Sequence, residues 1–170
     1  MAKWATITHT ARAAQAAAEA ICPGPSSGGQ SVTGGQGWAL PGSRWISSAD
    51  GPRPNKPVAG VGAFHFGTDI AAGCGQGVHA ASSGTVAYAG WLGSYGNRVL
   101  IHRGDGTQTG CAHNSSVLVT HGQQVSAGAT VALVGTTGAS SGCHVHCETR
   151  VNGARVNPQS VMSARGVTLG

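Results

Sequence analysis

Residues 97–113, NRVLIHRGDGTQTGCAH, decide the fold class, because they predict two strands joined by a tight turn. The triplet Gly104-Asp105-Gly106 between the two strands is typical of a hairpin. Short apolar and Thr-rich runs bounded by glycines predict further strands at 84–90, 129–135 and 143–151. We therefore expect a mainly β fold, in which a small antiparallel sheet folds over into a barrel-like domain.

The composition fits one domain with flanking segments. The chain has 170 residues, and its hydrophobic content of 40% is close enough to the average to form a core. The lack of helical periodicity after residue 21 excludes a long-helix bundle. We expect one short N-terminal helix at 8–21, followed by a Gly/Ser-rich linker that ends at residue 40. The domain itself would then occupy 41–160, with a C-terminal tail over 161–170.

The charge pattern excludes several kinds of partner. The formal net charge is +5, but the basic residues are scattered, so we expect no nucleic acid partner. Such a surface favours anionic polymers, including a bacterial cell wall. No run approaches the roughly 18 apolar residues of a membrane span, so none is expected. Arg12, Gln15 and Glu19 interrupt the Ala-rich N-terminus, which is therefore not a convincing signal peptide.

Four histidines and one aspartate form the pattern with the clearest chemistry. His65 and Asp69 lie four residues apart, and His144 and His146 share one face of a predicted strand. Alone, the pair His65 and Asp69 is more typical of an Asp-capped turn, and the pair His144 and His146 is more typical of surface histidines. Together, His65, Asp69 and His146 predict a three-ligand site that suits zinc. Three protein ligands leave a fourth position open for water, as in catalytic zinc sites, and His113 and His144 remain beside it.

Three motifs occur in a fixed order: HFGTDIAAG (65–73), CAHNSS (111–116) and GASSGCHVHCE (138–148). With the phrases YGNRVLIHRGDG (95–106) and HGQQVSAGATVALVGTTG (121–138), they resemble the M23 family of zinc endopeptidases, the lysostaphin and LytM-like enzymes. In finer detail they are similar to phage-borne and actinobacterial members. The resemblance covers residues 45–158.

This resemblance implies a peptidase domain that hydrolyses peptide cross-bridges or stem peptides of bacterial peptidoglycan. It assigns one Zn²⁺ per chain to His65, Asp69 and His146, with zinc-bound water as the nucleophile. It also makes His113 and His144 the general acid/base and the oxyanion stabiliser, with the division of roles left open. The alternative is a non-catalytic member that binds peptidoglycan or regulates a partner hydrolase. Such members typically lack ligands or catalytic histidines, whereas all five are present here.

Three residues depart from the family pattern: Cys111 and Cys147 replace aromatic residues, and Asn114 replaces an aliphatic one. Strand alternation predicts that Cys111 lies on the same face as His113, beside the active-site groove. From there it could close the zinc site as a fourth protein ligand and abolish catalysis. Cys147 is expected to face the core as a small buried hydrophobe.

Two further cysteines flank the motifs. Five cysteines without a C-x-x-C pair favour an oxidising compartment and at least one disulfide, with an odd thiol left over. Cys74 and Cys143 lie in loops beside the first and last motifs, so either could also reach the zinc. Our hypothesis is that they form a disulfide that fixes these loops. Glu148 shares the face of His144 and His146, where it either orients an imidazole or is a solvated strand residue.

The biological setting follows from the resemblance and from the composition. A phage lysin, a tail-associated lysin and a secreted hydrolase all fit the pattern. We therefore expect an extracellular, cell-wall or virion-associated location, and we expect a monomer.

Overall fold

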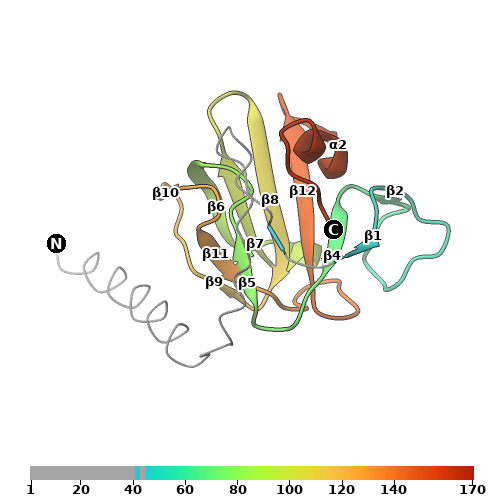
Figure 1. Ribbon diagram of the computed structural model, residues 1–170. Helices are drawn as coiled ribbons and strands as arrows, with labels where there is room; N and C mark the ends of the chain where they lie inside the picture. Colours follow the sequence, from blue (N-terminus) through green and yellow to red (C-terminus); the bar gives the residue numbers. More distant parts are fainter. Residues whose placement is uncertain (1–40, 43–44) are drawn as a thin grey trace. The chain divides into compact units, whose positions relative to one another are not determined.

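A large antiparallel sheet forms the centre of the fold (Figure 1), which the computed structural model describes over residues 41–42 and 45–170. The sheet contains, in spatial order, β1 (Ile46–Ser48), β4 (Thr68–Ala71), β12 (His144–Val151), β8 (Thr107–Asn114), β7 (Asn97–His102), β6 (Gly84–Trp91) and β10 (Gln124–Val125), and β13 (Ala154–Val156) pairs with β12. All its pairings are antiparallel, so the predicted mainly β fold is confirmed. The helix expected at 8–21 and the linker to residue 40 lie outside the described residues.

Shorter elements complete the fold. A three-stranded sheet contains β5 (Gly77–His79), β11 (Thr130–Leu133) and β9 (Ser116–Val117), and β2 (Gly51–Pro52) pairs with β3 (Phe64–His65). The 3-10 turn η1 (Gly93–Tyr95) links β6 to β7, and the helix α2 (Pro158–Ser163) follows β13. Within residues 41–42 and 45–170, no helix is long and apolar enough to span a bilayer.

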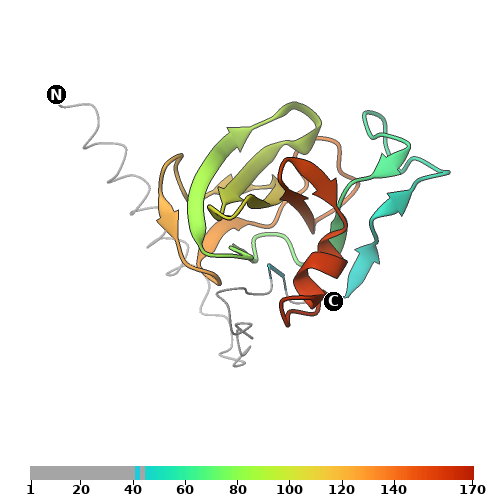
Figure 2. The same ribbon diagram turned by 90° about the horizontal axis from the view of Figure 1, so that it is seen from above.

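The hairpin predicted from residues 97–113 is formed by β7 and β8. Its register pairs Val99 with Cys111 and His102 with Gln108. Strands β6, β11 and β12 lie within two residues of the predicted runs. The view from above shows the curvature of the long strands, which folds the sheet over as expected (Figure 2).

The two faces of the large sheet differ in polarity. One face joins the three-stranded sheet in a common apolar core, and the other carries polar groups such as Arg98, His146 and Glu148. Successive side chains of a strand point to opposite faces, so the alternation along β12 separates core from site. The core includes Val78, Val86, Val99, Ile101, Cys111, Val131, Ala132, Val145 and Cys147.

The C-terminal segment also packs against this core, contrary to the expectation from its sequence. The side chain of Asn157 accepts a hydrogen bond from the backbone N–H of Gln159, 2.9 Å away, and so caps α2. Met162, Val167 and Leu169 are buried in the core, although residues 161–170 were expected to form a tail. A six-residue helix is too short to leave a clear helical period in the sequence.

Candidate metal and catalytic site

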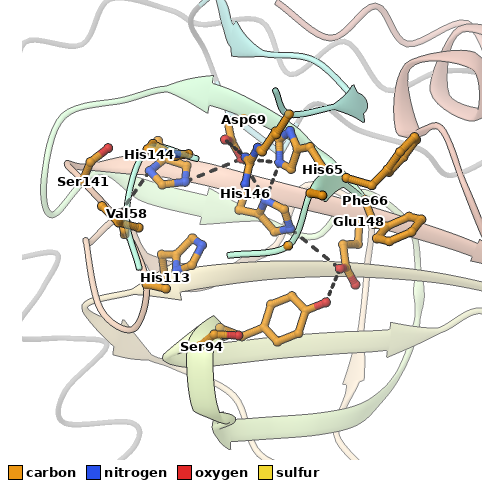
Figure 3. A pocket seen from close by; sticks show the side chains of 18 of the residues that line it. Val58, His65, Phe66, Asp69, Ser94, His113, Ser141, His144, His146 and Glu148 are labelled. Carbon is orange, nitrogen blue, oxygen red and sulfur yellow. Dashed lines mark hydrogen bonds and ion pairs between the residues drawn. The ribbon is translucent and has the colours of Figure 1, made fainter. Parts of the chain in front are cut away.

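Three strands of the large sheet, together with β3, bring the predicted site residues to one cavity (Figure 3). His65 ends β3, and Asp69 follows in β4. The register of β12 against β4 places His146 opposite Asp69, and His144 shares the face of His146. His113 comes from the end of β8. The structure therefore brings together all five residues that the sequence singled out.

Gly67 allows the first motif (65–73) and the last motif (138–148) to approach each other closely. A Cβ atom at this position would lie 2.6 Å from Cε1 of His146 and 2.6 Å from the carbonyl oxygen of Cys147. These separations are shorter than van der Waals contact, so any larger residue would displace the His146 ring. The glycine is therefore needed for the turn between His65 and Asp69 to lie directly against that ring.

Three potential ligand atoms converge at one point. Oδ1 of Asp69 lies 2.7 Å from Nδ1 of His146 and 3.1 Å from Nε2 of His65. The two imidazole nitrogens are 3.1 Å apart, and all three residues are buried. Ligand atoms around a tetrahedral zinc, each about 2.0–2.1 Å from the ion, are about 3.3 Å from one another. Shifts of a few tenths of an ångström would therefore convert this cluster into zinc coordination.

Backbone carbonyl groups fix the tautomers of three of the imidazoles. In each case Nδ1 lies 2.8–2.9 Å from a carbonyl oxygen, in the pairs His65–Ala49, His113–Thr137 and His144–Gly142. A carbonyl oxygen only accepts hydrogen bonds, so Nδ1 must donate and Nε2 presents its lone pair. Each of these rings therefore offers Nε2 to a metal, a proton or a polar hydrogen.

The same tautomers show that the cluster fits a cation. The lone pair on Nε2 of His65 faces the carboxylate of Asp69, and these two groups repel each other unless a positive charge lies between them. Nε2 of His65 and Oδ1 of Asp69 both lie within hydrogen-bond distance of Nδ1 of His146. This nitrogen can donate only one hydrogen, so it cannot satisfy both of them. A divalent cation would satisfy all three atoms, and two imidazole nitrogens with one carboxylate oxygen suit zinc.

Asp69 is held in its ionised form. Its Oδ2 lies 3.3 Å from Nη2 of Arg53, which favours the negative charge. Burial alone would raise the pKa of Asp69, but the hydrogen bond from His146 and the positive charge of that ring outweigh it and hold the pKa well below its usual range. Burial lowers the pKa of His146, but its hydrogen bond to Asp69 prevails and raises the pKa to about 8. The carboxylate is thus ready to act as a ligand.

An uncommon backbone conformation turns His113 into the site. Cys111 lies opposite Cys147 in the register of β8 and β12, and both side chains belong to the apolar core. Strand alternation alone would send His113 to the same side, but its φ of 62° is in the left-handed region and redirects the ring. The expectation that Cys111 lies beside the groove was therefore wrong, whereas the core position of Cys147 is confirmed.

His113 and His144 flank the three-ligand cluster. The centroid of the His113 ring lies 5.0 Å from that of His144 and 5.5 Å from that of His146. Burial lowers the pKa of His113 to about 4, so its imidazole is neutral at pH 7. Two imidazoles with accessible Nε2 lone pairs therefore lie next to the point where the cluster would hold a metal.

Glu148 belongs to a buried polar network beside His146. Its two carboxylate oxygens contact the hydroxyl of Tyr95 and Nη2 of Arg98, each at 2.5 Å. Its Oε1 lies 3.8 Å from Nε2 of His146, and only 4% of Glu148 is exposed, so it is not a solvated strand residue. Burial alone would raise the pKa of Glu148, but His146 and Arg98 lower it to about 2. No sequence pattern indicates a role for Tyr95 or Arg98.

A disulfide ties together two loops of the site. Cys74 lies in the loop after β4, and Cys143 directly precedes His144. The structure joins these two residues, as hypothesised, and leaves Cys111 and Cys147 as free, buried thiols. Among the described residues, no cysteine belongs to the two groups of closely spaced potential ligands, which are His65/Asp69/His146 and His113/His144/His146.

The five residues open into a cavity of about 590 Å³. Phe66 and Glu148 lie on one side of His146, and Ser141 and Val58 lie beyond His144 on the other (Figure 3). A second cavity of about 520 Å³ adjoins the first, because both are lined by Asp69 and His144. The candidate site is thus positioned along an extended hollow that could accommodate a chain-like substrate.

Known proteins share this sequence pattern. Residues 63–158 match the sequence profile of peptidase family M23. The chain is 40% identical over 116 residues to the DD-carboxypeptidase/endopeptidase Mpg of Neisseria meningitidis, which covers 68% of this chain and 26% of that protein. It is 38% identical over 124 residues to the murein hydrolase activator NlpD of Escherichia coli, which covers 71% of this chain and 32% of that protein. The chain thus spans about a quarter to a third of these relatives.

Solved structures share the fold. A zinc-containing peptidase from Vibrio cholerae has a TM-score of 0.63 and 32% identity, over 69% of this chain and 37% of that one. The catalytic domain of the antimicrobial peptidase lysostaphin from Staphylococcus simulans has a TM-score of 0.63 and 29% identity, over 69% of this chain and 91% of that one.

Proposed function

Since the chain belongs to peptidase family M23, we propose that it is a zinc-dependent endopeptidase that hydrolyses peptide cross-bridges or stem peptides of bacterial peptidoglycan. The observation that carries this proposal is the convergence of a three-ligand cluster with two further imidazoles in one cavity. Three protein ligands are the number found in catalytic zinc sites, whereas structural sites use four.

The chain's own residues would provide the ligands and move the protons. Zinc held by His65, Asp69 and His146 would supply an activated water and polarise the scissile carbonyl. His113 and His144 each offer the lone pair of Nε2, so either can accept the proton of the attacking water. An Nε2 that has accepted this proton becomes a donor, which can stabilise the oxyanion or protonate the leaving amine.

Two neighbours would hold the ligands in place. Arg53 pairs with the second carboxylate oxygen of Asp69 and leaves the first directed at the cluster. Glu148 lies next to Nε2 of His146, the nitrogen that faces away from the cluster, as carboxylates beside metal-bound histidines usually do. Both are positioning residues, because they act through the ligands.

The proposed setting is the bacterial cell wall, either through secretion or as part of a virion. The Cys74–Cys143 disulfide fits an oxidising compartment outside the cytoplasm. The formal charge of +5 favours contact with an anionic wall polymer. We propose that the protein acts there as a monomer.

A second candidate function is the activation of another hydrolase, because a relative at 38% identity is named a murein hydrolase activator. An activator needs no functional metal site. The presence of all five residues in one arrangement therefore favours the enzyme.

The test is the release of new amino groups from purified peptidoglycan, with and without a zinc chelator. The zinc-loaded protein should release them, and the chelator, Asp69→Asn and His113→Ala should each abolish release. His121→Ala is the matched control, because His121 is exposed and does not line the cavity, and it should leave release unchanged. Zinc-loaded protein that releases no amino groups from several wall types, but increases the activity of a second hydrolase, would establish the activator instead.

A further inference from the structure

We propose that Arg155 binds a carboxylate of the substrate at the Phe66 end of the cavity, so that the site selects peptides with a free carboxylate near the cleaved bond. This inference rests on the proposed function and adds a specificity-determining residue to it. Arg155 lines the cavity, but neither the sequence motifs nor the metal cluster accounts for it.

The β12–β13 hairpin places Arg155 on the site face of the sheet. The register pairs Arg155 with Arg150. Side chains of directly opposite residues point to the same face, and Arg150 shares that face with Glu148 and His146 through the alternation of β12. A shift of the hairpin register by one residue would turn Arg155 away from the cavity.

Positive charge exceeds negative charge at this end of the cavity. Glu148 is the carboxylate here, and it already pairs with Arg98 at 2.5 Å, while Arg150 lies 3.8 Å from it. Among the described residues, Arg155 has no carboxylate partner within 4.0 Å, whereas the other cavity arginine, Arg53, pairs with Asp69. An anionic group of a ligand would supply the missing partner of Arg155.

The guanidinium of Arg155 is held in place before any ligand arrives. Its Cζ lies 4.8 Å from the centroid of the Phe66 ring, and its Nη2 donates a hydrogen bond to the hydroxyl of Tyr95 at 3.1 Å. Tyr95 in turn donates to Glu148, so this hydroxyl accepts from Arg155. Arg155 is exposed, but these two contacts already orient its guanidinium, so it loses less freedom on binding than an unrestrained arginine would.

The chemistry of the surrounding surface indicates a peptide carboxylate. A planar guanidinium matches a carboxylate through two parallel hydrogen bonds, and one contact with Tyr95 leaves most of its five donors available. The rings of Phe64 and Phe66 pack against each other at a tilt of 37°, with centroids 4.6 Å apart, yet the two residues are 39% and 43% exposed. They offer an apolar surface for the aliphatic part of a residue whose carboxylate reaches Arg155.

The experiment compares two forms of one substrate. Cross-linked peptide fragments released from peptidoglycan by a glycosidase are used as they are, or after their carboxylates have been converted to carboxamides. The wild-type zinc protein should cleave the free-acid form with a kcat/KM roughly ten- to a hundredfold higher than the carboxamide form. Arg155→Gln should bring this ratio close to one, mainly through a higher KM for the free acid.

Arg150→Gln is the matched control, because it removes the same charge from the opposite position on β12 and does not line the cavity. It should retain the preference for the free acid. Equal cleavage of both forms by the wild type, or an unchanged ratio in Arg155→Gln, would overturn the inference. Equilibrium binding of the two forms repeats the comparison without turnover. Absence of cleavage would therefore count against the proposed function alone, and binding would still decide the role of Arg155.

Discussion

Removal of the Cys74–Cys143 disulfide should lower the free energy of unfolding by about 4 kcal/mol. The two cysteines are separated by 69 residues, and the loop-closure entropy of a cross-link of that length corresponds to about 4 kcal/mol at 25 °C. The bond restricts the conformations of the unfolded chain. In the folded protein it restrains the loop of Cys143, the residue directly before His144. Removal of the bond should therefore mainly lower the free energy of unfolding, and it should also loosen the position of His144 in the site.

Urea unfolding of the full chain measures this effect through four samples. The wild type and Cys74→Ser/Cys143→Ser are each unfolded with and without a thiol reductant. The reductant should destabilise the wild type to the level of the double variant and leave the double variant unchanged. Cys111 and Cys147 remain in both proteins, so any effect of the reductant on them would appear in the double variant.

Two results would refute this reasoning. A loss below about 1 kcal/mol would show that the unfolded chain gains little freedom from the break. An equal response of both proteins to the reductant would show that the relevant thiols are elsewhere.

The double variant should also lose activity. Its zinc-dependent cleavage should fall more than its folded fraction, because the loop before His144 is released.

Three more predictions concern the metal cluster and its buried neighbours. Gly67→Ala should weaken zinc binding at least about tenfold in a zinc titration, because the new Cβ would displace the His146 ring. Gly62→Ala is the control and should leave zinc binding unchanged, because its Cβ would meet nothing closer than 3.6 Å. Zinc at about a thousand times its Kd should stabilise the wild type by about 4 kcal/mol in thermal unfolding, and Asp69→Asn should lose this response; an equal response would contradict the ligand assignment. Glu148→Gln should cost about 3 kcal/mol in urea unfolding, because it leaves Arg98 buried without a charged partner. Asp105→Asn, which breaks an exposed pair with Arg103, should cost under about 1 kcal/mol, and similar losses in the two variants would contradict the prediction for Glu148.

The hairpin and the histidine pair were predictable because both follow from local sequence patterns. A Gly-Asp-Gly turn between two short strand-forming runs specifies β7 and β8, and strand alternation places His144 and His146 on one face. The α2 helix was missed, because six residues are too few for a period, although Asn157 before Pro158 is a typical helix start.

The surroundings of the site could not be predicted in the same way. Glu148 lies 50 residues from Arg98 and 53 from Tyr95, so their contacts depend on the register of three strands rather than on any local pattern. Cys111 was misplaced for a different reason. The rule that side chains alternate between faces holds only for extended backbone, and His113 has a positive φ. His113 and Cys111 therefore point to different sides, although they are two residues apart.

The carbonyl groups that orient His65, His113 and His144 have a consequence for protein engineering. They belong to the backbone of Ala49, Thr137 and Gly142, so the hydrogen bonds do not depend on which side chains occupy these positions. The loops around the groove can therefore be diversified to change substrate range without retuning the protonation of the imidazoles. Insertions and deletions are different, because they move the carbonyl itself. A library that varies residue identity at fixed loop length should retain far more working variants than one that varies loop length.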